Sequence, residues 1–394
     1  MTRLPGGRAA TGTGPLLRAM KICFYTPFKP LDHPNPSGDL VTARDLFEFL
    51  AGRGHTVSTA SSLRCRWIAW KPWLWPRVLW ERQRAARRFQ PGRWDLWFSY
   101  HSYYKAPDML GPAVSRRLGI PYVIFQGIYS TRRRRRWLTR PGFELNRSAL
   151  LAAHRIFTNK RGDLTNLRRL VPEERITYVA PGLNPGQFAF DPAARLQLRR
   201  AWGAGDDPVI LSVAMFRPGV KADGLSWVIR TCGELVRRGR RFRLVVAGDG
   251  RERSRLERLA RNEIGDRVRF VGRVPRCELY RFYSAADLFF FPGIREALGM
   301  VYLEAQSCGL PVVAFENAGV PEAVQKDRTG LLTPLLDGWA LVDAVERLLS
   351  DAALRRRMGE CAKVYVRECH DLEKNYGMMD EILRRMVATP AGTG

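Results

Sequence analysis

Residues Phe291–Val324 constrain the possible folds of this chain more than any other segment. They follow an apolar strand at Asp287–Phe291 and contain a polar loop, a short helix and a second apolar strand at Pro311–Phe315. Alternating strands and helices predict an open parallel sheet. Ligands bind such sheets outside the carboxyl ends of the strands, so the polar loop predicts a binding site.

Two carboxylates, Glu296 and Glu304, stand eight positions apart in this segment, with the turn residue Gly299 between them. The predicted helix starts at this glycine, so the backbone N–H groups of Gly299, Met300 and Val301 are available to bind phosphate. Glu296 in the loop can accept hydrogen bonds from hydroxyl groups. Anion donors beside hydroxyl acceptors suit a sugar nucleotide, although two Glu residues at this spacing are often only surface charges of a helix.

The flanking residues favour the functional interpretation. The segment resembles the E-x7-E segment of the retaining glycosyltransferases of family 4, in which E-G-F-G-x-x-x-x-E precedes G-x-P-V-V-A and G-G-x-P-E. The matching positions are Glu296, Gly299, Glu304, Gly309 to Ala314, Gly319, Pro321 and Glu322. Ala297 and Ala318 stand where the family more often has glycine.

The resemblance spans about Met20–Val387 and is strongest over Val209–Leu332. It implies an α/β protein of the GT-B fold, with two Rossmann-like doubly wound domains facing each other across a cleft. It also implies a C-terminal helix that crosses back to the N-terminal domain.

The apolar patterns predict two series of strands with helices between them. The first series is Lys21–Tyr25, Thr56–Ala60, Leu96–Tyr100, Tyr122–Phe125, Arg155–Thr158 and Ile176–Ala180. The second series is Val209–Ala214, Phe242–Ala247, Val268–Val271, Leu288–Phe291, Val312–Phe315 and Gly330–Thr333. The clearest helices are Asp39–Leu50, Pro107–Leu118, Pro141–Ala153, Asp163–Leu170, Ala352–Val366 and Leu372–Val387.

Pro181–Gly186 is dense in turn formers and predicts the linker between the domains. We expect an acceptor-binding domain over 20–182, a nucleotide-sugar-binding domain over 187–369, and a helix over 370–387 that packs back on the first domain. Residues 1–19 are interpreted as a disordered tail or as an over-extended start, with Met20 as the alternative start.

The resemblance implies further donor-site residues. Arg217 and Lys221 correspond to the G-R-x-x-x-x-K-G motif of the family, with one residue fewer between them. Positive charge at this place would stabilise the departing diphosphate. Gly248 and Gly250 resemble the G-x-G turn that lies near the nucleotide.

Other motifs extend the implied site. Arg273 and Val274 belong to the F-x-G-x-V loop that lines the nucleobase pocket, and Gly38 ends the Gly-rich loop after the first strand. His101 matches the second histidine of a strand-end H-x-H-S pattern, and is expected to be either catalytic or structural. Gln126 replaces the histidine of T-x-H-G; it can bond a sugar hydroxyl but cannot take a proton.

The resemblance implies transfer with retention at the anomeric carbon, and no nucleophile for a two-step route is apparent in the first domain. We therefore expect attack from the same face, with the departing diphosphate accepting the proton. No Asp-x-Asp pair and no H-x-x-x-H spacing occur, so we expect metal-independent catalysis and no cofactor besides the donor. Thr26–Pro30 lacks G-x-G-x-x-G, which disfavours a nicotinamide dehydrogenase.

The distribution of basic and aromatic residues predicts which surface binds the acceptor or a membrane. The formal net charge is +27, and most of the excess lies before residue 180. Trp67, Trp70, Trp73 and Trp75 are interleaved with basic residues, and Arg132, Arg133, Arg134, Arg135 and Arg136 form an uninterrupted run. Trp with Arg favours the lipid headgroup layer or the phosphate of a lipid-linked acceptor. Two alternatives to lipid binding are open for these residues. The arginines could form an exposed basic loop that only reflects an Arg-rich genome, or they could bind nucleic acid, although the sequence has no signature of a nucleic-acid-binding module.

Together these features predict a hexosyltransferase that uses a UDP- or GDP-sugar and a glycan, lipid-linked or lipopolysaccharide acceptor in cell-envelope polysaccharide synthesis. No apolar run is long enough to span a bilayer, and the seven cysteines form no C-x-x-C pair. We therefore expect a cytoplasmic protein that lies peripherally on the inner face of an anionic membrane. We expect no nucleic-acid partner. The alternatives are a sugar-nucleotide epimerase on the same fold and a non-catalytic basic protein that binds anionic lipid or nucleic acid.

Overall fold

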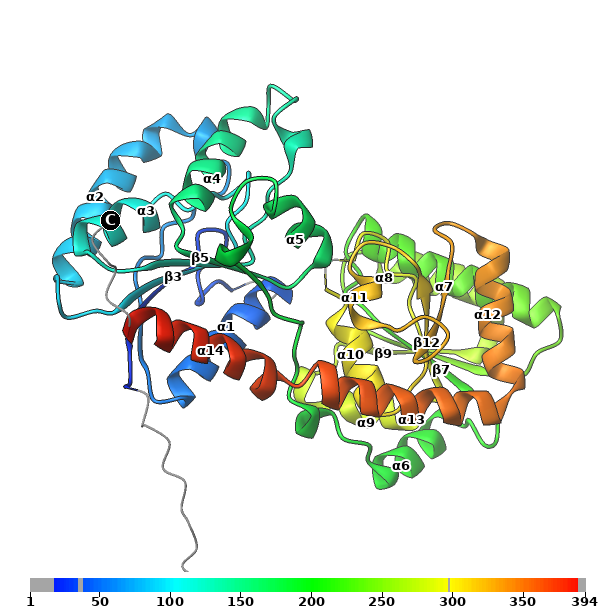
Figure 1. Cartoon of the computed structure of the whole chain (residues 1–394). Coiled ribbons are helices and arrows are strands. Elements are labelled where there is room, and N and C mark those ends of the chain that lie inside the picture. Colours follow the sequence, from blue (N-terminus) through cyan, green and yellow to red (C-terminus); the bar gives the residue numbers. More distant parts are fainter. Residues whose placement is uncertain (1–17, 35–37, 297, 389–394) are drawn as a thin grey trace, which may run out of the picture. The chain divides into compact units, whose positions relative to one another are not determined.

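A computed structural model gives the fold (Figure 1) and describes residues 18–34, 38–296 and 298–388. The chain divides into two compact units. The first unit runs to Ile156 and resumes at Met379, and the second runs Phe157–Met378. The functional domain boundaries at 182 and 187 stay a prediction.

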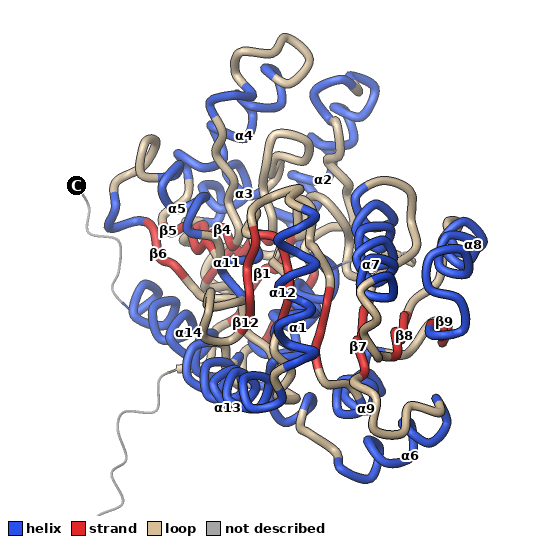
Figure 2. Tube along the Cα trace, turned by 90° about the vertical axis from the view of Figure 1, so that its right-hand side faces the viewer, coloured by secondary structure: helices blue, strands red, loops and turns tan. Residues whose placement is uncertain are grey.

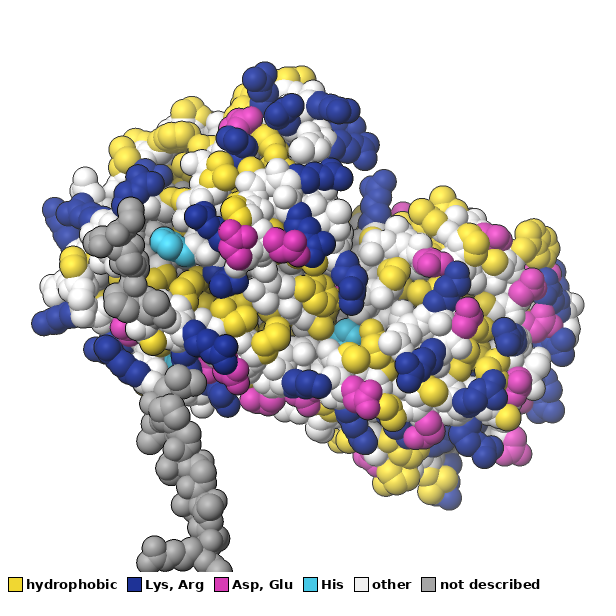
Figure 3. All heavy atoms as spheres, in the orientation of Figure 1, with side chains coloured by type: hydrophobic (Ala, Val, Ile, Leu, Met, Phe, Trp, Pro, Cys, Tyr) yellow, Lys and Arg dark blue, Asp and Glu magenta, His cyan; other side chains and the backbone are white. Residues whose placement is uncertain are grey.

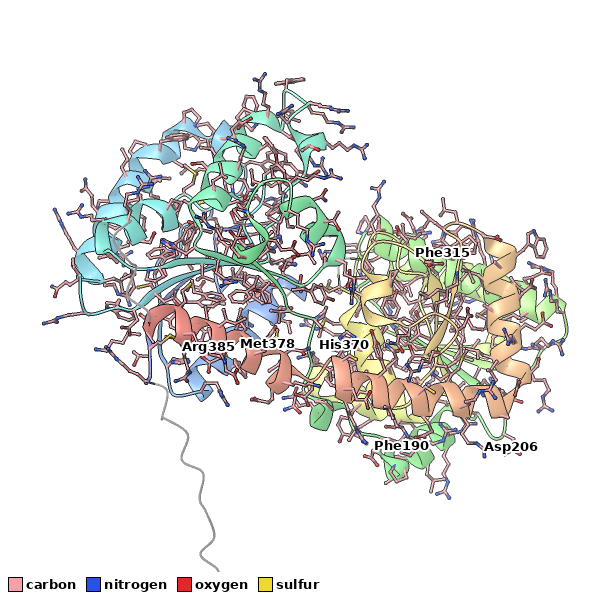
Figure 4. All side chains as sticks on the ribbon, viewed as in Figure 1. Phe190, Asp206, Phe315, His370, Met378 and Arg385 are labelled. Atoms are coloured by element: carbon pink, nitrogen blue, oxygen red, sulfur yellow. The ribbon has the colours of Figure 1, made fainter. Side chains whose placement is uncertain are left out.

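The last helix, α14 (Leu372–Ala388), begins in the second unit and ends in the first. Figure 4 labels His370 just before this helix, and Met378 and Arg385 along it. In the first unit Asp380 is fully buried, and its Oδ1 lies 2.6 Å from His55 Nε2. The predicted helix that crosses back to the N-terminal domain is therefore confirmed.

The first sheet has the strand order β2-β1-β3-β4-β5-β6. Its strands are β1 (Lys21–Tyr25), β2 (Thr56–Thr59), β3 (Leu96–Tyr100), β4 (Tyr122–Phe125), β5 (Arg155–Thr158) and β6 (Ile176–Tyr178). β1 runs parallel to β2 and β3, and β3 runs parallel to β4. Phe24 and Phe98 stack across β1 and β3 with 5.5 Å between ring centroids. Such apolar strands are typical of a parallel sheet covered on both faces.

The second sheet has the order β12-β11-β10-β7-β8-β9, and its neighbouring strands run parallel. Its strands are β7 (Val209–Val213), β8 (Arg243–Ala247), β9 (Val268–Gly272), β10 (Leu288–Phe290), β11 (Val312–Phe315) and β12 (Gly330–Thr333). The chain builds outward from β7 to β9 and then returns to place β10 on the other side of β7. This is the doubly wound arrangement that the sequence predicts.

Helices cover both sheets. In the first unit they are α1 (Gly38–Gly52), α2 (Trp75–Arg88), α3 (Gly111–Leu118) and α4 (Arg140–Ala152). In the second unit they are α5 (Arg161–Leu167), α6 (Pro192–Trp202), α7 (Val220–Arg237), α8 (Arg253–Ile264), α9 (Leu279–Ala285), α10 (Met300–Ser307), α11 (Val320–Ala323), α12 (Gly338–Ser350) and α13 (Ala352–Cys369). Figure 2 shows α7 and α8 on one side of β7, β8 and β9, and α6 and α9 on the other.

α7 shows why these segments form helices. Its buried side chains include Leu225, Val228, Ile229, Cys232 and Leu235, which recur at three- and four-residue steps and so line one face. That face packs into the hydrophobic core of the second unit. The same period on the printed sequence predicts the helix.

The predicted helix Pro107–Leu118 begins later, at Gly111. The reason is the side chain of Asp108, whose Oδ1 accepts hydrogen bonds from the N–H groups of Leu110 and Gly111 at 2.9 and 2.8 Å. An aspartate that bonds the first backbone donors acts as a cap and fixes where the helix starts.

Candidate active site

The second sheet reverses its direction of growth between β7 and β10. In open α/β sheets, ligands bind outside the carboxyl ends of the strands at such a switch point. β7 leads through the loop that carries Arg217 into α7, whose first turn carries Lys221, and β10 leads into the loop that carries Glu296. The topology therefore brings together two segments that the sequence separates.

Lys221 and Glu296 meet at this point as an ion pair between Nζ and Oε2. Their side chains are only 17% and 16% exposed. The Lys221 ammonium group also lies 5.1 Å from the ring centroid of Phe291, within the range of a cation–π interaction. A cation and a carboxylate are thus held side by side at the switch point.

Helix α10 starts beside this pair. Gly299 precedes it with a φ of 67°, and a Cβ at this glycine would run into the ring of Tyr302. Tyr302 donates a hydrogen bond from its hydroxyl to the carbonyl oxygen of Phe291 at 2.9 Å, which ties the helix start to the end of β10. The N–H groups of Met300 and Val301 belong to the first turn, where no intrahelical acceptor exists. The structure thus places the predicted anion donors at a helix N-terminus.

Glu304 lies further along α10 and is 3% exposed. Its Oε1 accepts a hydrogen bond from Arg276 Nε at 2.9 Å, and its Oε2 accepts one from the Tyr283 hydroxyl at 3.1 Å. Burial, followed by the charge of Glu304, raises the pKa of Tyr283, so this hydroxyl stays protonated and donates. We expect Glu304 to hold the ribose of the donor, and no contact among the described residues tests this expectation.

The turn with Gly248 and Gly250 has a structural requirement of its own. Both glycines have positive φ, 144° and 150°. A Cβ at Gly248 would collide with the carbonyl oxygen of Ala214, and one at Gly250 would lie 2.5 Å from that of Phe216. The N–H of Phe216 also donates to the Asp249 carbonyl at 2.9 Å. The glycines therefore let the loops after β7 and β8 pack together, whether or not they also approach a nucleotide.

The remaining predicted donor residues lie on neighbouring loops. Arg217 is exposed on the loop after β7, and no described residue forms an ion pair with it. Arg273 is exposed and Val274 is half-buried on the loop after β9. Gly38 belongs to the first unit, where it starts α1 with open space around the position of a Cβ. Ser37, which precedes it in the predicted loop, lies outside the described residues.

In the first unit, His101 and Gln126 directly follow β3 and β4. These strands pair in register, Tyr100 opposite Phe125, so the two side chains emerge at the same edge of the sheet. Both residues are buried and adopt a left-handed φ, 64° and 61°. The His101 ring stacks on Tyr103 with 4.7 Å between centroids.

The surroundings of His101 and Gln126 differ from those of ordinary core residues. His101 Nδ1 lies 3.8 Å from Asp39 Oδ1. Neither polar atom of the Gln126 side chain has a hydrogen-bond partner among the described residues. A buried amide without partners and a strained backbone both cost free energy, and both are frequent at ligand-binding sites. Gln126 is 1% exposed, so it lies with His101 at the carboxyl ends of β3 and β4 and is not part of the exposed basic face.

The predicted acceptor face divides into exposed and covered residues. Trp70, Trp73 and Trp75 are exposed, whereas Trp67 is half-buried against Tyr104. In the arginine run the exposed members are Arg132, Arg134, Arg135 and Arg136. Arg133 is half-buried, with its guanidinium 4.5 Å from the Tyr104 ring centroid.

Arg276 and Tyr283, the partners of Glu304, are absent from the predicted site. Arg276 stands two positions after Val274. Its positive charge next to the predicted nucleobase loop is the sequence signal that could have placed it in the site. No sequence signal marks Tyr283, because its contact with Glu304 depends on the packing of α9 against α10.

No group of three or more His, Cys, Asp or Glu among the described residues is arranged to hold a metal ion. Within the same residues, no helix has the length and hydropathy needed to cross a membrane.

Residues 195–365 match the family described as glycosyl transferases group 1. A D-inositol 3-phosphate glycosyltransferase from Frankia alni is 34% identical over 301 residues, which is 70% of each chain. This chain belongs to the group 1 glycosyltransferases. The family membership confirms the predicted glycosyltransferase, and the assignment to family 4 stays a prediction.

Two other relatives of this glycosyltransferase match over shorter stretches. The GDP-mannose-dependent alpha-(1-6)-phosphatidylinositol monomannoside mannosyltransferase of Mycolicibacterium smegmatis is 35% identical over 48% of this chain and 50% of its own. The alpha-D-kanosaminyltransferase of Streptomyces kanamyceticus is 34% identical over 54% of each chain. The matched region thus spans about half the length of these curated relatives.

Solved structures share the fold of this glycosyltransferase over almost the whole chain. Sucrose-phosphate synthase from Thermosynechococcus elongatus aligns with a TM-score of 0.73 at 22% identity, covering 94% of this chain and 99% of its own. Anabaena HepE in complex with UDP aligns with a TM-score of 0.71 at 18% identity, covering 93% and 100%. With the two parallel sheets, this likeness confirms the predicted two-domain GT-B fold.

Proposed function

We propose that this protein transfers a sugar, with retention, from a UDP- or GDP-sugar to a glycan or lipid-linked acceptor in cell-envelope polysaccharide or lipopolysaccharide synthesis. The observation that carries the proposal is the Lys221–Glu296 ion pair at the switch point between β7 and β10. Beside this pair lies the N-terminus of α10. A cation, a carboxylate and free backbone N–H groups are what a sugar diphosphate needs.

The proposed reaction breaks the bond between the anomeric carbon and the diphosphate oxygen. The acceptor hydroxyl forms the new bond on the same face, and its proton passes to the departing diphosphate. Arg217, Lys221 and the first N–H groups of α10 stabilise the charge that develops on this leaving group. Glu296 orients the sugar through its hydroxyls, and Glu304 holds the ribose. No step is assigned to a metal ion.

Names of the related proteins guide the choice of substrates. The mycobacterial relative is named as GDP-mannose-dependent, whereas HepE was solved with UDP, so both nucleotides are tested. The acceptors in the names of two relatives, phosphatidylinositol monomannoside and D-inositol 3-phosphate, both contain phosphate. The strongly basic first half of this chain supports a phosphate-bearing acceptor. We assign the acceptor to the first unit, near His101 and Gln126, and place the protein on the cytoplasmic face of the membrane.

Nucleoside diphosphate release from UDP-glucose, UDP-N-acetylglucosamine and GDP-mannose tests the proposal, with and without an extract of bacterial membrane lipids. We expect release with one nucleotide class only, dependent on the acceptor, and a product with the anomeric configuration of the donor by NMR. Conversion of the sugar nucleotide without any acceptor would instead indicate an epimerase.

A further inference from the structure

Helix α2 exposes larger apolar side chains than it buries. Its inner face carries Val78, Ala85 and the carboxylate of Glu81, which accepts a hydrogen bond from Ser61 Oγ at 3.0 Å. On its outer face Leu79 and Trp80 are each 56% exposed. A helix normally buries its apolar side and exposes its charges. This inverted pattern indicates that the outer face has a partner outside the chain.

The segment before α2 extends the same surface. Trp70 ends the short helix η1 (Ile68–Trp70), Trp73 lies in η2 (Pro72–Leu74), and Trp75 starts α2. All three are exposed, Trp73 by 69%. Large contiguous apolar patches are rare on soluble monomers and usually mark interaction sites.

A second segment is fastened to this surface. Trp70 donates from its indole N–H to the carbonyl oxygen of Leu138 at 2.8 Å, and its ring meets that of Trp137 edge-on with 5.8 Å between centroids. Trp137 is itself 77% exposed. These contacts bring the exposed arginines of the 132–136 run beside the tryptophans of 70–80. We call the exposed residues of 70–80 and 132–138 the tryptophan–arginine face.

Figure 3 shows hydrophobic and basic side chains mixed over the part of the molecule where Figure 1 labels α2 and α4. The sequence contains no Asp or Glu within 62–80 or within 126–143. Positive charge on this face is therefore not neutralised by residues of its own two segments.

A basic pocket opens in the same segment. Its volume is about 390 Å³, and its lining includes Arg64, Arg66, Lys71 and Arg77 but no carboxylate. Lys71 and Arg77 belong to the stretch that carries the exposed tryptophans. Four cations around a hollow of this size suit a phosphate group, which accepts charge-assisted hydrogen bonds from several donors at once.

We propose that the tryptophan–arginine face binds the surface of a bilayer containing anionic phospholipids, and that the basic pocket takes the phosphate of a headgroup. Tryptophan rings preferentially bind at the boundary between headgroups and acyl chains, and arginines beside them form ion pairs with lipid phosphates. The inference deepens the proposed function, on which it rests for a lipid-linked acceptor, but bilayer binding itself needs no sugar donor.

Charge favours a bilayer over a second copy of this chain. A two-fold dimer through this face would place the same patch on both copies, so that the two arginine runs would be brought together. Like charges at an interface oppose association. An anionic bilayer instead attracts every arginine of the face.

The test is vesicle flotation with the full-length protein, comparing phosphatidylcholine vesicles with vesicles that also contain phosphatidylglycerol. We expect binding to require phosphatidylglycerol and to weaken about 100-fold in the Arg134→Gln/Arg135→Gln/Arg136→Gln variant. Trp73→Ser/Trp80→Ser/Trp137→Ser should also lose most binding. Because all these side chains are exposed, the variants should unfold at the temperature of the unmodified protein.

A matched control removes the same charge elsewhere. Arg251, Arg258 and Arg261 are exposed on or next to α8 in the second unit, and their replacement by Gln should leave vesicle binding within about twofold. The pocket variant Lys71→Gln/Arg77→Gln should reduce binding to phosphatidylglycerol vesicles. If soluble glycerol 3-phosphate binds this pocket but the protein does not bind vesicles, the bilayer proposal is wrong.

Three further results would overturn the inference. They are equal binding to neutral and anionic vesicles, preference for a single-stranded oligonucleotide over vesicles, and a dimer in sedimentation that the tryptophan variant abolishes. Glu296→Gln separates this inference from the proposed function. We expect that variant to lose sugar transfer and keep vesicle binding.

Discussion

Lys221 donates a hydrogen bond to Glu296 from 75 positions away in the sequence, and this ion pair joins the first turn of α7 to the loop after β10. Both side chains are largely withdrawn from solvent. Removing one partner of such a pair leaves the other charge without compensation. The pair is therefore both a structural link and the centre of the proposed donor site.

Replacing Lys221 with Met should lower kcat/KM for the sugar donor about 100-fold or more, because the departing diphosphate loses a fixed positive charge. Steady-state assays of nucleoside diphosphate release measure this. The matched control is Lys326→Met, since Lys326 pairs with Glu316 at 2.7 Å on the exposed surface of the same unit. A Lys221→Met enzyme with more than a third of normal kcat/KM would contradict the assignment.

Tyr283→Phe should raise the KM for the donor about tenfold while kcat changes little. The hydroxyl of Tyr283 holds Glu304, and a hydrogen bond to a charged group contributes about 1.5–3 kcal/mol. If Glu304 binds the ribose equally in the ground and transition states, misplacing it weakens donor binding alone. Tyr280→Phe on the same helix is the control. A fall in kcat at constant KM would show that Tyr283 acts in another way.

Gly248→Ala should lower the free energy of unfolding by about 2 kcal/mol or more, as judged by urea unfolding of the purified protein. The added Cβ combines a strained positive φ with a collision at the Ala214 carbonyl. Gly162→Ala offers the comparison, because open space surrounds that position in α5 and alanine favours a helix. Equal stability of the two variants would rule out the tight packing of the loops after β7 and β8.

Asp287 should make the protein sensitive to acid. Its carboxylate accepts hydrogen bonds at 2.7 Å from Arg195 and from Arg199. Burial raises the pKa of Asp287, but Arg195, the N–H of Val209 and the charge of Arg199 together outweigh it, so the pKa lies below the ordinary 3.8. Because the folded-state pKa is the lower one, the stabilisation is complete above pH 3.8 and is lost as the pH falls through the folded-state value.

Asp287→Asn should accordingly cost about 3 kcal/mol of unfolding free energy at pH 7. The difference in unfolding free energy between this variant and the unmodified protein should become smaller as the pH falls below the ordinary pKa range of aspartate. Chemical unfolding at a series of pH values measures both. A gap that stays constant with pH would mean that the Asp287 charge does not stabilise the fold.

Much of the fold could be predicted because the strands of both sheets are continuous apolar runs separated by turn residues. β11 and the Gly309–Ala314 motif are one example, and the helical spacing of Leu225 to Leu235 in α7 is another. Glu296 and Gly299 could be placed at a strand exit for the same reason. Local patterns carry this information without tertiary contacts.

Helix α2 could not be predicted in this way, because it turns Glu81 inward and Leu79 and Trp80 outward. Its sequence contradicts the rule that apolar residues face the core. The partners of Glu304 were missed for a different reason. Arg276 stands close to the predicted nucleobase loop, but its contact and that of Tyr283 with Glu304 depend on long-range packing.

The most direct test of the account is a thermal-shift screen of the purified protein with UDP, GDP, ADP and CDP in the presence of EDTA. One nucleoside diphosphate, at about 100 times its dissociation constant, should raise the melting temperature by about 5 °C, and Arg217→Ala should abolish the shift. No shift with any nucleotide, or an undiminished shift in the Arg217→Ala variant, would contradict the donor site proposed at the carboxyl ends of β7 and β10.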